Sequence, residues 1–295
     1  MMDGVLNVRK EKGFTSHDVV AKLRGILHMK KIGHTGTLDP EAEGVLPVVL
    51  GKATRLVDML TEKEKTYEAL LHLGIETDTQ DMTGTVLKEL PVTVTEEDVK
   101  KAAESFLGEQ QQIPPMYSAL KVDGKKLYEL AREGKTVERK PRTVYFREIS
   151  ILEMKLPLVR ISVTCSKGTY IRTLCHDIGQ RLGGGGCMEE LLRTRSGQFC
   201  LDDSLTLGEI QTLMDQGQIE EHLTRIQDIL GEYPALTGRK MADRLLKNGN
   251  PVTEALTDHS YRNGWVRMHT SDGVFIGIYQ WHQASETYRP VKMFL

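Results

Sequence analysis

The sequence is short of cysteine, of long apolar runs and of any segment that marks export. Its longest apolar run, Val45 to Leu50, is broken by Pro47 and is far too short to cross a bilayer, so no membrane span is expected. The first residues lack the basic and then apolar pattern of a signal peptide, which predicts a cytoplasmic location. The cysteines form no Cys-x-x-Cys pair and no Cys/His cluster at zinc spacing, so we expect reduced, packed thiols. They are Cys165, Cys175, Cys187 and Cys200.

A large net charge of either sign is also missing from the chain as a whole. The 39 lysines and arginines nearly balance the 41 aspartates and glutamates, which gives a formal net charge of −2. With 39% hydrophobic and 27% charged residues, the composition is that of a globular protein and excludes disordered and collagen-like chains. A length of 295 residues predicts about two domains.

Helical and strand periodicities alternate irregularly along the first part of the chain. N-capping residues precede two segments of helical apolar spacing, 16–27 and 96–107. Residues 159–165 alternate like a half-buried strand, and residues 171–182 return to helical spacing. This order lacks a regular βαβ rhythm and predicts a mixed α+β sheet. The caps are Thr15 or Ser16 for the first helix, and Thr95 with Asp98 for the second.

A boundary between two domains is predicted at Tyr233-Pro234. Residues 219–230 have helical apolar spacing, and Gly231 follows as a stop signal. Beyond the boundary, the pattern changes to a short helix and three strands separated by turns. The sequence therefore predicts one domain over 1–232 and a small β-rich domain over 233–295, near the lower size limit for independent folding. The elements of the small domain are expected at 241–247, 265–269, 274–281 and 291–294.

Positive charge is concentrated in one segment, residues 114–147. Nine basic and four acidic residues give this segment a net charge of +5, while the rest of the chain carries −7. Lys121 and Arg142 are among the basic residues, and three tyrosines are interleaved with them. Such a segment suits a phosphate backbone. A solvated charged helix and loop has the same composition, however, and composition alone favours that interpretation.

Asp39 lies in the densest cluster of unusual residues, the segment Gly33 to Pro40. Two glycines in this segment allow tight backbone conformations, and Asp39-Pro40 is a turn-forming pair. An aspartate on such a loop can serve as a nucleophile or base at the lip of a cleft. An aspartate that only caps the following turn would have the same local sequence, so the residues alone leave both interpretations open.

Several common chemistries are not supported. The segment 51–54 resembles the end of a phosphate-binding loop, but Leu46 stands at the position of the required glycine and Ala53 at that of the hydroxyl residue. The nine histidines form no His-x-x-x-His pair with a suitable acid, and there is no Gly-x-Ser-x-Gly elbow. Neither a nucleotide-hydrolysing site, nor a metal site, nor a serine hydrolase is predicted.

Six separated motifs, spread in order over about 190 residues, together carry more information than any one of them. The central one joins residues 33–40 to Gly44-Val45-Leu46-Pro47 and to Gly51-Lys52-Ala53-Thr54. The others lie at 4–20, 65–81, 112–124, 168–174 and 191–194. In this order they resemble the motifs of the bacterial TruB-type tRNA pseudouridine synthases, and the resemblance runs through most of the chain.

The resemblance implies catalytic roles for three residues. Asp39 is implied to attack the target uridine, so that its glycosidic bond breaks and the base reattaches through carbon. Arg172 is implied to pair with Asp39 and to hold it ionised and oriented, which suits a permanently charged, bidentate guanidinium. Tyr67 is implied to stack on the flipped base and to abstract the proton that completes the isomerisation. A phenol with a reference pKa of about 10 needs help from its site in that second role.

Other residues are implied to bind the RNA. Tyr170 and Leu191 are implied to line the pocket, and His34 to insert among the T-loop bases in the space that the extruded nucleotide leaves. Residues 114–147 correspond to a mobile RNA-clamping insertion. The C-terminal part resembles a PUA-like RNA-binding domain, beside a catalytic domain with a mixed, mainly antiparallel sheet flanked by helices. The basic contacts expected with the RNA are Lys52, Lys121 and Arg142.

The implied substrate is the T-arm stem-loop of tRNA. No cofactor or metal is expected, because isomerising uridine is close to thermoneutral and changes no redox state. The absence of coiled-coil heptads predicts a monomer without an obligate protein partner. Two other interpretations stay open: an RNA-binding or RNA-folding protein without essential catalysis, and the same chemistry on another RNA.

Two departures from the family pattern stand out. The family usually has Lys-Pro where this chain has Lys10-Glu11, which removes a rigid backbone angle near the first motif. Leu192 stands where relatives more often carry an arginine, so one basic contact is expected to be absent.

Overall fold

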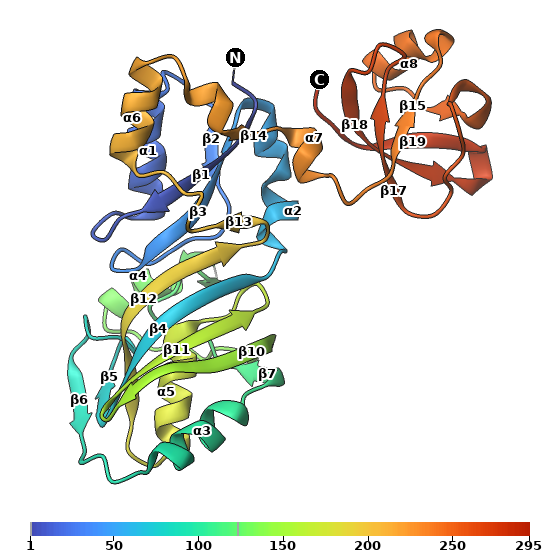
Figure 1. Cartoon of the computed structure of the whole chain (residues 1–295). Coiled ribbons are helices and arrows are strands. Elements are labelled where there is room, and N and C mark those ends of the chain that lie inside the picture. The colour runs from blue at the N-terminus through green and yellow to red at the C-terminus, as the bar shows by residue number, and fades with distance from the viewer. Residues whose placement is uncertain (1, 123) are drawn as a thin grey trace.

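The computed structural model describes residues 2–122 and 124–295, so Met1 and Asp123 lie outside the described residues. Asp123 is one of the four acids counted in the segment 114–147. Figure 1 shows a large part built around a long twisted sheet and a small β-rich part that carries the C-terminus. Among the described residues, no helix is both long enough and apolar enough to span a membrane.

The large sheet has ten strands, eight of them in the order β14-β1-β3-β12-β4-β11-β10-β7. Neighbours on this path are antiparallel, except that β12 runs parallel to β3. The predicted mixed, mainly antiparallel sheet is confirmed. Its strands are β1 (Gly4–Lys10), β2 (Ile32–His34), β3 (Glu43–Leu50), β4 (Lys65–Leu73), β7 (Gly108–Gln112), β10 (Arg142–Lys155), β11 (Leu158–Cys165), β12 (Gly186–Ser196), β13 (Phe199–Cys200) and β14 (Leu223–Thr224).

The helices begin where capping residues predict them. Thr15 caps α1 (Ser16–Ile26) in a reciprocal capping box with Asp18, and α3 (Glu96–Glu104) has the same box. Helix α5 (Ile171–Arg181) packs on β12 and β4, while α3 packs against α5 and β10. At the other end of the sheet, α1 lies beside α6 (Leu207–Asp215), as Figure 1 shows. The expected helices at 16–27, 96–107 and 171–182 are confirmed, although α3 ends three residues early.

Alternation along β4 decides which of its side chains enter the core. Every second residue from Lys65 to Leu73 is buried, and the residues between them are half-buried. Tyr67 therefore shares a face with Ala69 and Leu71, which pack with the apolar residues of β11 and α5. The same alternation brings Lys65 and the Tyr67 phenol into the protein interior at the start of the strand.

The segment 114–147 forms short elements and loops at the surface. They are β8 (Lys121–Val122), β9 (Lys125–Lys126) and α4 (Leu127–Arg132), and β10 begins at Arg142. Leu127 is buried, whereas Lys121 and Arg142 are exposed. The remaining short elements of the large part are α2 (Val57–Thr61), β5 (Ile75–Thr77) and β6 (Val86–Glu89).

The helix predicted over 219–230 is wrong. The structure has a 3₁₀ turn (Ile219–His222), then β14, then the single-turn helix α7 (Ile226–Ile229). Leu223 and Thr224 pair with Leu6 and Val5 at the edge of β1, so they lie in a strand. Helical spacing of apolar residues is also produced by short elements that bury them against two different clusters, which is the case here.

The small part contains a five-stranded sheet in the order β15-β17-β18-β19-β16. Its final strand begins at Thr287, earlier than the predicted 291, because the buried Tyr288 already pairs with Trp281. The boundary at Tyr233-Pro234 remains a prediction, and the first strand of this sheet starts at Ala235. The elements are β15 (Ala235–Thr237), α8 (Asp243–Lys247), β16 (Val252–Thr253), β17 (Trp265–His269), β18 (Phe275–His282) and β19 (Thr287–Met293).

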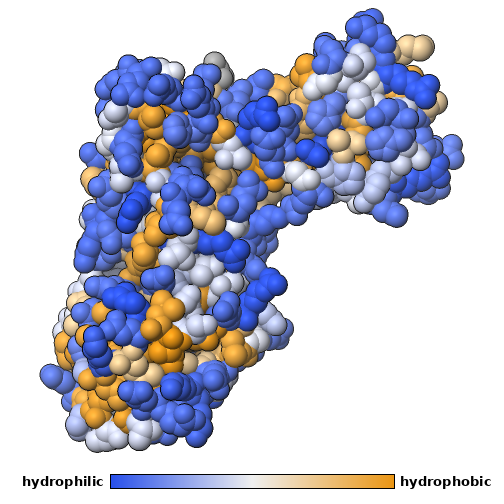
Figure 2. All heavy atoms as spheres, in the orientation of Figure 1, coloured by the Kyte–Doolittle hydropathy of each residue, from blue (hydrophilic) through white to orange (hydrophobic). Residues whose placement is uncertain are grey.

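The two parts share one apolar cluster. Ile278 and Phe294 of the small part pack in the same cluster as Val5 and Leu56 of the large part. Lys292 also pairs with Asp58 on α2, with 2.7 Å between Nζ and Oδ2. On the face drawn in Figure 2, hydrophilic residues cover most of the small part, and apolar residues gather toward the lower end of the large sheet.

Gly44 permits the closest approach of backbones in the sheet, where β3 meets β12. A Cβ at Gly44 would lie 2.2 Å from the Arg193 carbonyl oxygen, and its φ is +103°. We expect Gly44→Ala to lower the free energy of unfolding by about 3 kcal/mol or more. Gly13→Ala is the matched control, because Gly13 also has a positive φ (+87°) but no atom within 4 Å. The control is expected to lose only about 1–2 kcal/mol in urea unfolding, and equal losses would contradict the steric argument.

Candidate active site

The loop between β2 and β3 presents Asp39. Its neighbour Leu38 is buried and donates its N–H to the Ser16 hydroxyl on α1, with 2.9 Å between nitrogen and oxygen. Gly36 has a φ of +81°, a left-handed conformation that glycine adopts without strain. The Asp39 side chain is 40% exposed. Its carboxylate is therefore carried by a fixed backbone and remains open to a reactant.

Arg172, the second residue of α5, holds Asp39 by a two-point contact. Its Nε lies 3.0 Å from Asp39 Oδ2, and its Nη2 lies 3.3 Å from Oδ1. This is the arrangement in which a planar guanidinium matches a carboxylate. The hydrogen bond that closes the following turn comes from the Asp39 carbonyl, which accepts the Ala42 N–H at 3.1 Å. The carboxylate itself is directed to Arg172, which is not the arrangement of a simple turn cap.

The other donors of Arg172 are also used. Nη2 donates to the Tyr117 carbonyl at 2.9 Å. Nη1 donates to the Thr79 carbonyl and to Asp81 Oδ2, both at 3.3 Å. The five N–H groups of the guanidinium thus have five acceptor contacts, and two of the partners are carboxylates. We had not predicted Asp81 as a site residue. Its position inside the motif at 65–81 is the signal that was available.

Burial and charge act in opposite directions on Asp39. Removal of water raises the pKa of the Asp39 carboxyl, and the nearby Asp81 charge adds to that rise. The Arg172 guanidinium opposes it by stabilising the carboxylate, and Lys10 contributes in the same direction. The ionised form of Asp39 therefore depends on these two cations.

Lys10 is a second residue that sequence reasoning treated only as part of a departure from the family pattern. It is fully buried, and its Nζ donates to the Pro40 carbonyl at 3.0 Å and to the Ala42 carbonyl. Burial lowers the pKa of Lys10 to about 8, so the ammonium is still mainly charged at neutral pH. Lys10 thus ties the chain on both sides of residue 41 to β1.

Tyr67 lies on β4 directly opposite Arg193 of β12 and Val163 of β11. Burial raises the pKa of the Tyr67 phenol, while the charge of Arg193 acts in the opposite direction. Leu191, two residues before Arg193, is half-buried and packs on the apolar cluster that contains Leu38 and Tyr67. The structure therefore brings Leu191 and Tyr67 together beside the Asp39 loop.

Tyr170 precedes α5 and is fixed by its backbone. Its N–H donates to Gln112 Oε1 at 2.8 Å, and its carbonyl accepts from Gln112 Nε2 at 3.0 Å. Burial raises the pKa of the Tyr170 phenol, and the nearby Ser118 hydroxyl and the charge of Arg142 oppose that rise. Arg142 is therefore near enough to Tyr170 to influence it, and Asp39 and Arg172 act on the same phenol.

His34 ends β2, five residues before Asp39. Its ring meets that of His17 edge to face, with 5.3 Å between ring centroids, and its Nδ1 is buried without a hydrogen-bond partner. Burial, aided by His17 and Arg193, lowers the pKa of His34 to about 4, so its imidazole is neutral at physiological pH. The partnership with His17 was not predicted.

Two further basic residues, Lys121 and Lys52, were predicted to contact the RNA. Lys121 is exposed on β8. Lys52 follows the end of β3 that is remote from Gly44, where its backbone N–H donates to Asp3 Oδ1 at 2.7 Å and its Nζ lies 4.0 Å from Asp3 Oδ2. The structure does not bring Lys52 to Asp39, and its RNA contact stays a prediction.

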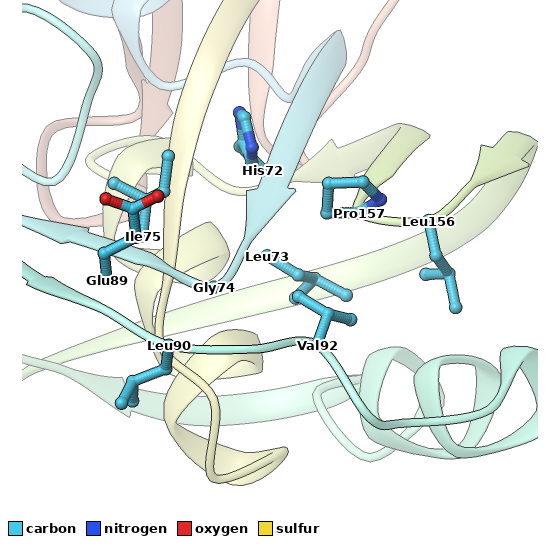
Figure 3. Close-up of a pocket in the computed structure, with 9 residues that line it drawn as sticks. All are labelled: His72, Leu73, Gly74, Ile75, Glu89, Leu90, Val92, Leu156 and Pro157. Atoms are coloured by element: carbon cyan, nitrogen blue, oxygen red, sulfur yellow. The ribbon is translucent and has the colours of Figure 1, made fainter.

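The cavity drawn in Figure 3 lies elsewhere, at the opposite end of β4 from Tyr67. Its volume is about 320 Å³, and none of the site residues named above lines it. His72, Glu89 and Val92 are among the residues around it. Within residues 2–122 and 124–295, no group of three or more His, Cys, Asp or Glu side chains is arranged to hold a metal ion.

Comparison with known proteins finds one family along the chain. Residues 24–171 match the N-terminal domain of the TruB family pseudouridylate synthases, and residues 172–230 match the tRNA pseudouridylate synthase B C-terminal domain. The tRNA pseudouridine synthase B of Lachnoclostridium phytofermentans is 50% identical, with 100% of both chains covered. That of Bacillus subtilis is 42% identical, over 100% of this chain and 98% of its own.

Two solved structures have a similar fold. A chain in a Cbf5-Nop10-Gar1 complex superposes with a TM-score of 0.75 at 29% identity, over 100% of this chain and 85% of that one. A chain in an H/ACA RNP bound to a substrate RNA containing 2′-deoxyuridine gives a TM-score of 0.73 at 27% identity, over 100% and 86%. The family matches together extend over residues 24–230, and the relatives align with the whole chain. This chain belongs to the TruB family of pseudouridylate synthases.

Proposed function

We propose that this protein isomerises the conserved T-loop uridine of tRNA, position 55, to pseudouridine, with Asp39 as the nucleophile. The observation that carries the proposal is the bidentate Asp39–Arg172 pair beside the buried Tyr67. The family supports the reaction class, and the names of the relatives support tRNA as the substrate. A protein that only binds or refolds RNA has no need for a half-exposed carboxylate held by a guanidinium whose N–H groups all have acceptors.

In this reaction the bond between C1′ and N1 breaks, and a bond between C1′ and C5 forms. The proton on C5 leaves, and N1 gains a proton, so uridine and product have the same atoms. Asp39 supplies the electron pair that stabilises the detached fragment. Arg172 keeps that carboxylate ionised and aimed, a positioning effect that is worth orders of magnitude in rate.

The target base must leave the RNA stack before Asp39 can reach it. Extruding a base costs a few kcal/mol. Stacking on an aromatic ring returns about 1–3 kcal/mol, a role for Tyr67. Leu191 and Tyr170 then complete the walls of the pocket. The neutral His34 takes the place of the extruded nucleotide among the T-loop bases without adding a charge to the stack.

The exposed basic segment 114–147 is proposed to hold the RNA backbone. Lys121 and Arg142 are exposed on separate elements of this segment, and Arg142 lies opposite Gln112, which holds the Tyr170 backbone. The Tyr117 carbonyl of the same segment accepts from Arg172, so the segment is attached directly to the catalytic pair. The small β-rich part is proposed to bind RNA as a PUA-like domain, and the protein to act as a cytoplasmic monomer.

Asp39→Asn is expected to abolish turnover while leaving tRNA affinity within a few-fold, because the amide is isosteric and the loop is held by its backbone. The measurement is pseudouridine formation on an unmodified T-arm stem-loop transcript, with the product position mapped, alongside a binding titration. Wild-type product at the T-loop uridine is the positive control. Turnover by Asp39→Asn would remove Asp39 as the nucleophile, and wild-type product at another uridine would contradict the proposed target.

Two substitutions of Arg172 are expected to distinguish the effect of its charge on Asp39 from the effect of its two-point geometry. Arg172→Gln removes the cation that lowers the pKa of Asp39, so the rise of kcat with pH, which requires the carboxylate, should move upward by about one unit or more. Arg172→Lys keeps a charge but loses the fork, so it should lose rate by about a hundredfold with a smaller shift. The measurement is the pH profile of single-turnover rates, and a profile unchanged in Arg172→Gln would refute the pairing.

Raising salt is expected to weaken tRNA binding if the basic segment contacts phosphates. Removing one phosphate contact, in Lys121→Ala or Arg142→Ala, should reduce the slope of log affinity against log salt concentration by about one. Lys155→Ala is the matched control, since Lys155 is exposed at the far end of β10 and pairs with Glu153. Unchanged slopes for Lys121 and Arg142 would restore the interpretation of a solvated charged surface.

A further inference from the structure

Arg193 is the largest of the fully buried side chains, and only 1% of its surface is exposed. Arg172 pairs with two carboxylates, whereas none of the ion pairs found among the described residues includes Arg193. Removing a guanidinium from water costs several kcal/mol, and an apolar residue of similar size is often as good for stability. Stability alone therefore does not account for a lone arginine at this position.

The anchors of Arg193 are two backbone carbonyls. Its Nε donates to the Val45 carbonyl at 2.6 Å, and its Nη2 donates to the Gly36 carbonyl at 3.0 Å. Gly36 lies three residues before Asp39, and Val45 lies on the strand that follows the loop. The guanidinium thus joins the two sides of the Asp39 loop, and the bare backbone of Gly44 lets β3 approach Arg193 closely enough for this.

The same guanidinium lies beside the Tyr67 phenol. Arg193 and Tyr67 are directly opposite each other across β12 and β4, so their side chains lie on the same face of the sheet. The other ionisable groups that act on this phenol are Cys165 from β11 and Asp39 from the loop, and both disfavour its anion. Lys65 shares the buried face of β4, but its Nζ donates to the carbonyls of Thr61 and Lys63. Among the described residues, Arg193 is thus the cation that lies opposite Tyr67 and acts on its phenol.

We infer that Arg193 is a positioning residue for the last step of the reaction: it aims the Tyr67 phenol at the reattached base and stabilises the phenolate that removes the proton from C5. This inference rests on the proposed function. Arg193 supplies the positive charge that a phenol needs to act as a general base. It also links that base to the nucleophile, because the residue opposite Tyr67 is the one that holds the Asp39 loop.

In this proton transfer, every bond that breaks is matched by a bond that forms. The phenolate oxygen takes the proton from C5, and the electron pair of that bond forms the C5–C6 double bond. The pair of the C6–N1 double bond moves onto N1, which takes a proton from water. The Tyr67 phenol then returns its proton to water, so no oxidant, reductant or further reactant is required.

The experiment replaces Arg193 and then adjusts the acidity of Tyr67. Arg193→Gln removes the charge. Arg193→Lys, which keeps a buried cation, is the second variant in case Arg193→Gln does not fold. Each is expected to lower the single-turnover rate constant by about a hundredfold, which is within the range for a general base. The tRNA affinity is expected to stay within threefold of wild type. Incorporating 3-fluorotyrosine at position 67, whose phenol is more acidic, is expected to restore at least tenfold of that loss and to move the rise of rate with pH downward.

Rescue by fluorotyrosine distinguishes an Arg193 that only stabilises the fold from one that assists Tyr67 as the general base. If either folded variant loses rate and fluorotyrosine does not restore it, Arg193 serves only the fold and the inference is wrong. Unchanged kcat in Arg193→Gln or Arg193→Lys would also overturn it. Arg160→Gln is the matched control, because Arg160 lies on the adjacent strand β11 in a partly exposed pair with Glu190, and its kcat should stay within twofold.

Failure of the proposed function gives a different result from failure of this inference. If the wild-type protein forms no pseudouridine in a T-arm transcript, or if Asp39→Asn retains turnover, the proposed function is wrong irrespective of Arg193. If wild type is active and Asp39→Asn is not, the response to fluorotyrosine tests Arg193 alone.

Discussion

The guanidinium of Arg172 is the constraint on which the site depends. A buried arginine must find acceptors for five N–H groups. Helix α5 carries Arg172, and the acceptors come from three other chain segments: the Asp39 loop, the turn with Thr79 and Asp81, and Tyr117. Leaving one donor unpaired in the interior costs about 1–3 kcal/mol. The arrangement of Asp39 and Arg172 is therefore reached only when these segments are all in their native places, so that folding and assembly of the candidate site are the same event.

Positive charge buried behind the Asp39 loop gives the site its electrostatic character. Lys10, Lys65 and Arg193 are all buried, and the contacts of their charged groups are mainly with backbone carbonyls. These dipoles compensate for lost water without neutralising the charge, so the field remains available to Asp39 and Tyr67. A chain with a net charge of −2 thus presents buried cations beside the Asp39 carboxylate and the Tyr67 phenol.

Local signals predicted local elements, while the site depends on contacts that no local pattern encodes. The capping boxes at Thr15 and Thr95 and the alternation before Cys165 act within a few residues, and the corresponding helices and strand are present. The helix predicted over 219–230 is wrong because the apolar spacing fits a helix, whereas the structure of this segment is decided by pairing with β1, more than 200 residues away. Asp39 was ambiguous from its own loop for the same reason, since Arg172 is 133 positions distant. The family motifs supplied that pairing, but not Arg193, because a cross-strand neighbour is visible only once the register of β4 and β12 is known.

The shared apolar cluster determines how the role of the small β-rich part has to be examined. Phe294 and Ile278 cover Leu56 and Leu60 of the large part, and Arg55 donates to the Met293 carbonyl across the same contact. Removing the small part would expose this face next to Asp58, so a truncated chain would lose stability and RNA contacts together. Substitutions of exposed basic residues on the small sheet leave the cluster intact and report on RNA alone. Because the two parts are packed against each other, an RNA that touches both would meet one preformed surface and would not pay the entropy of ordering a flexible tether.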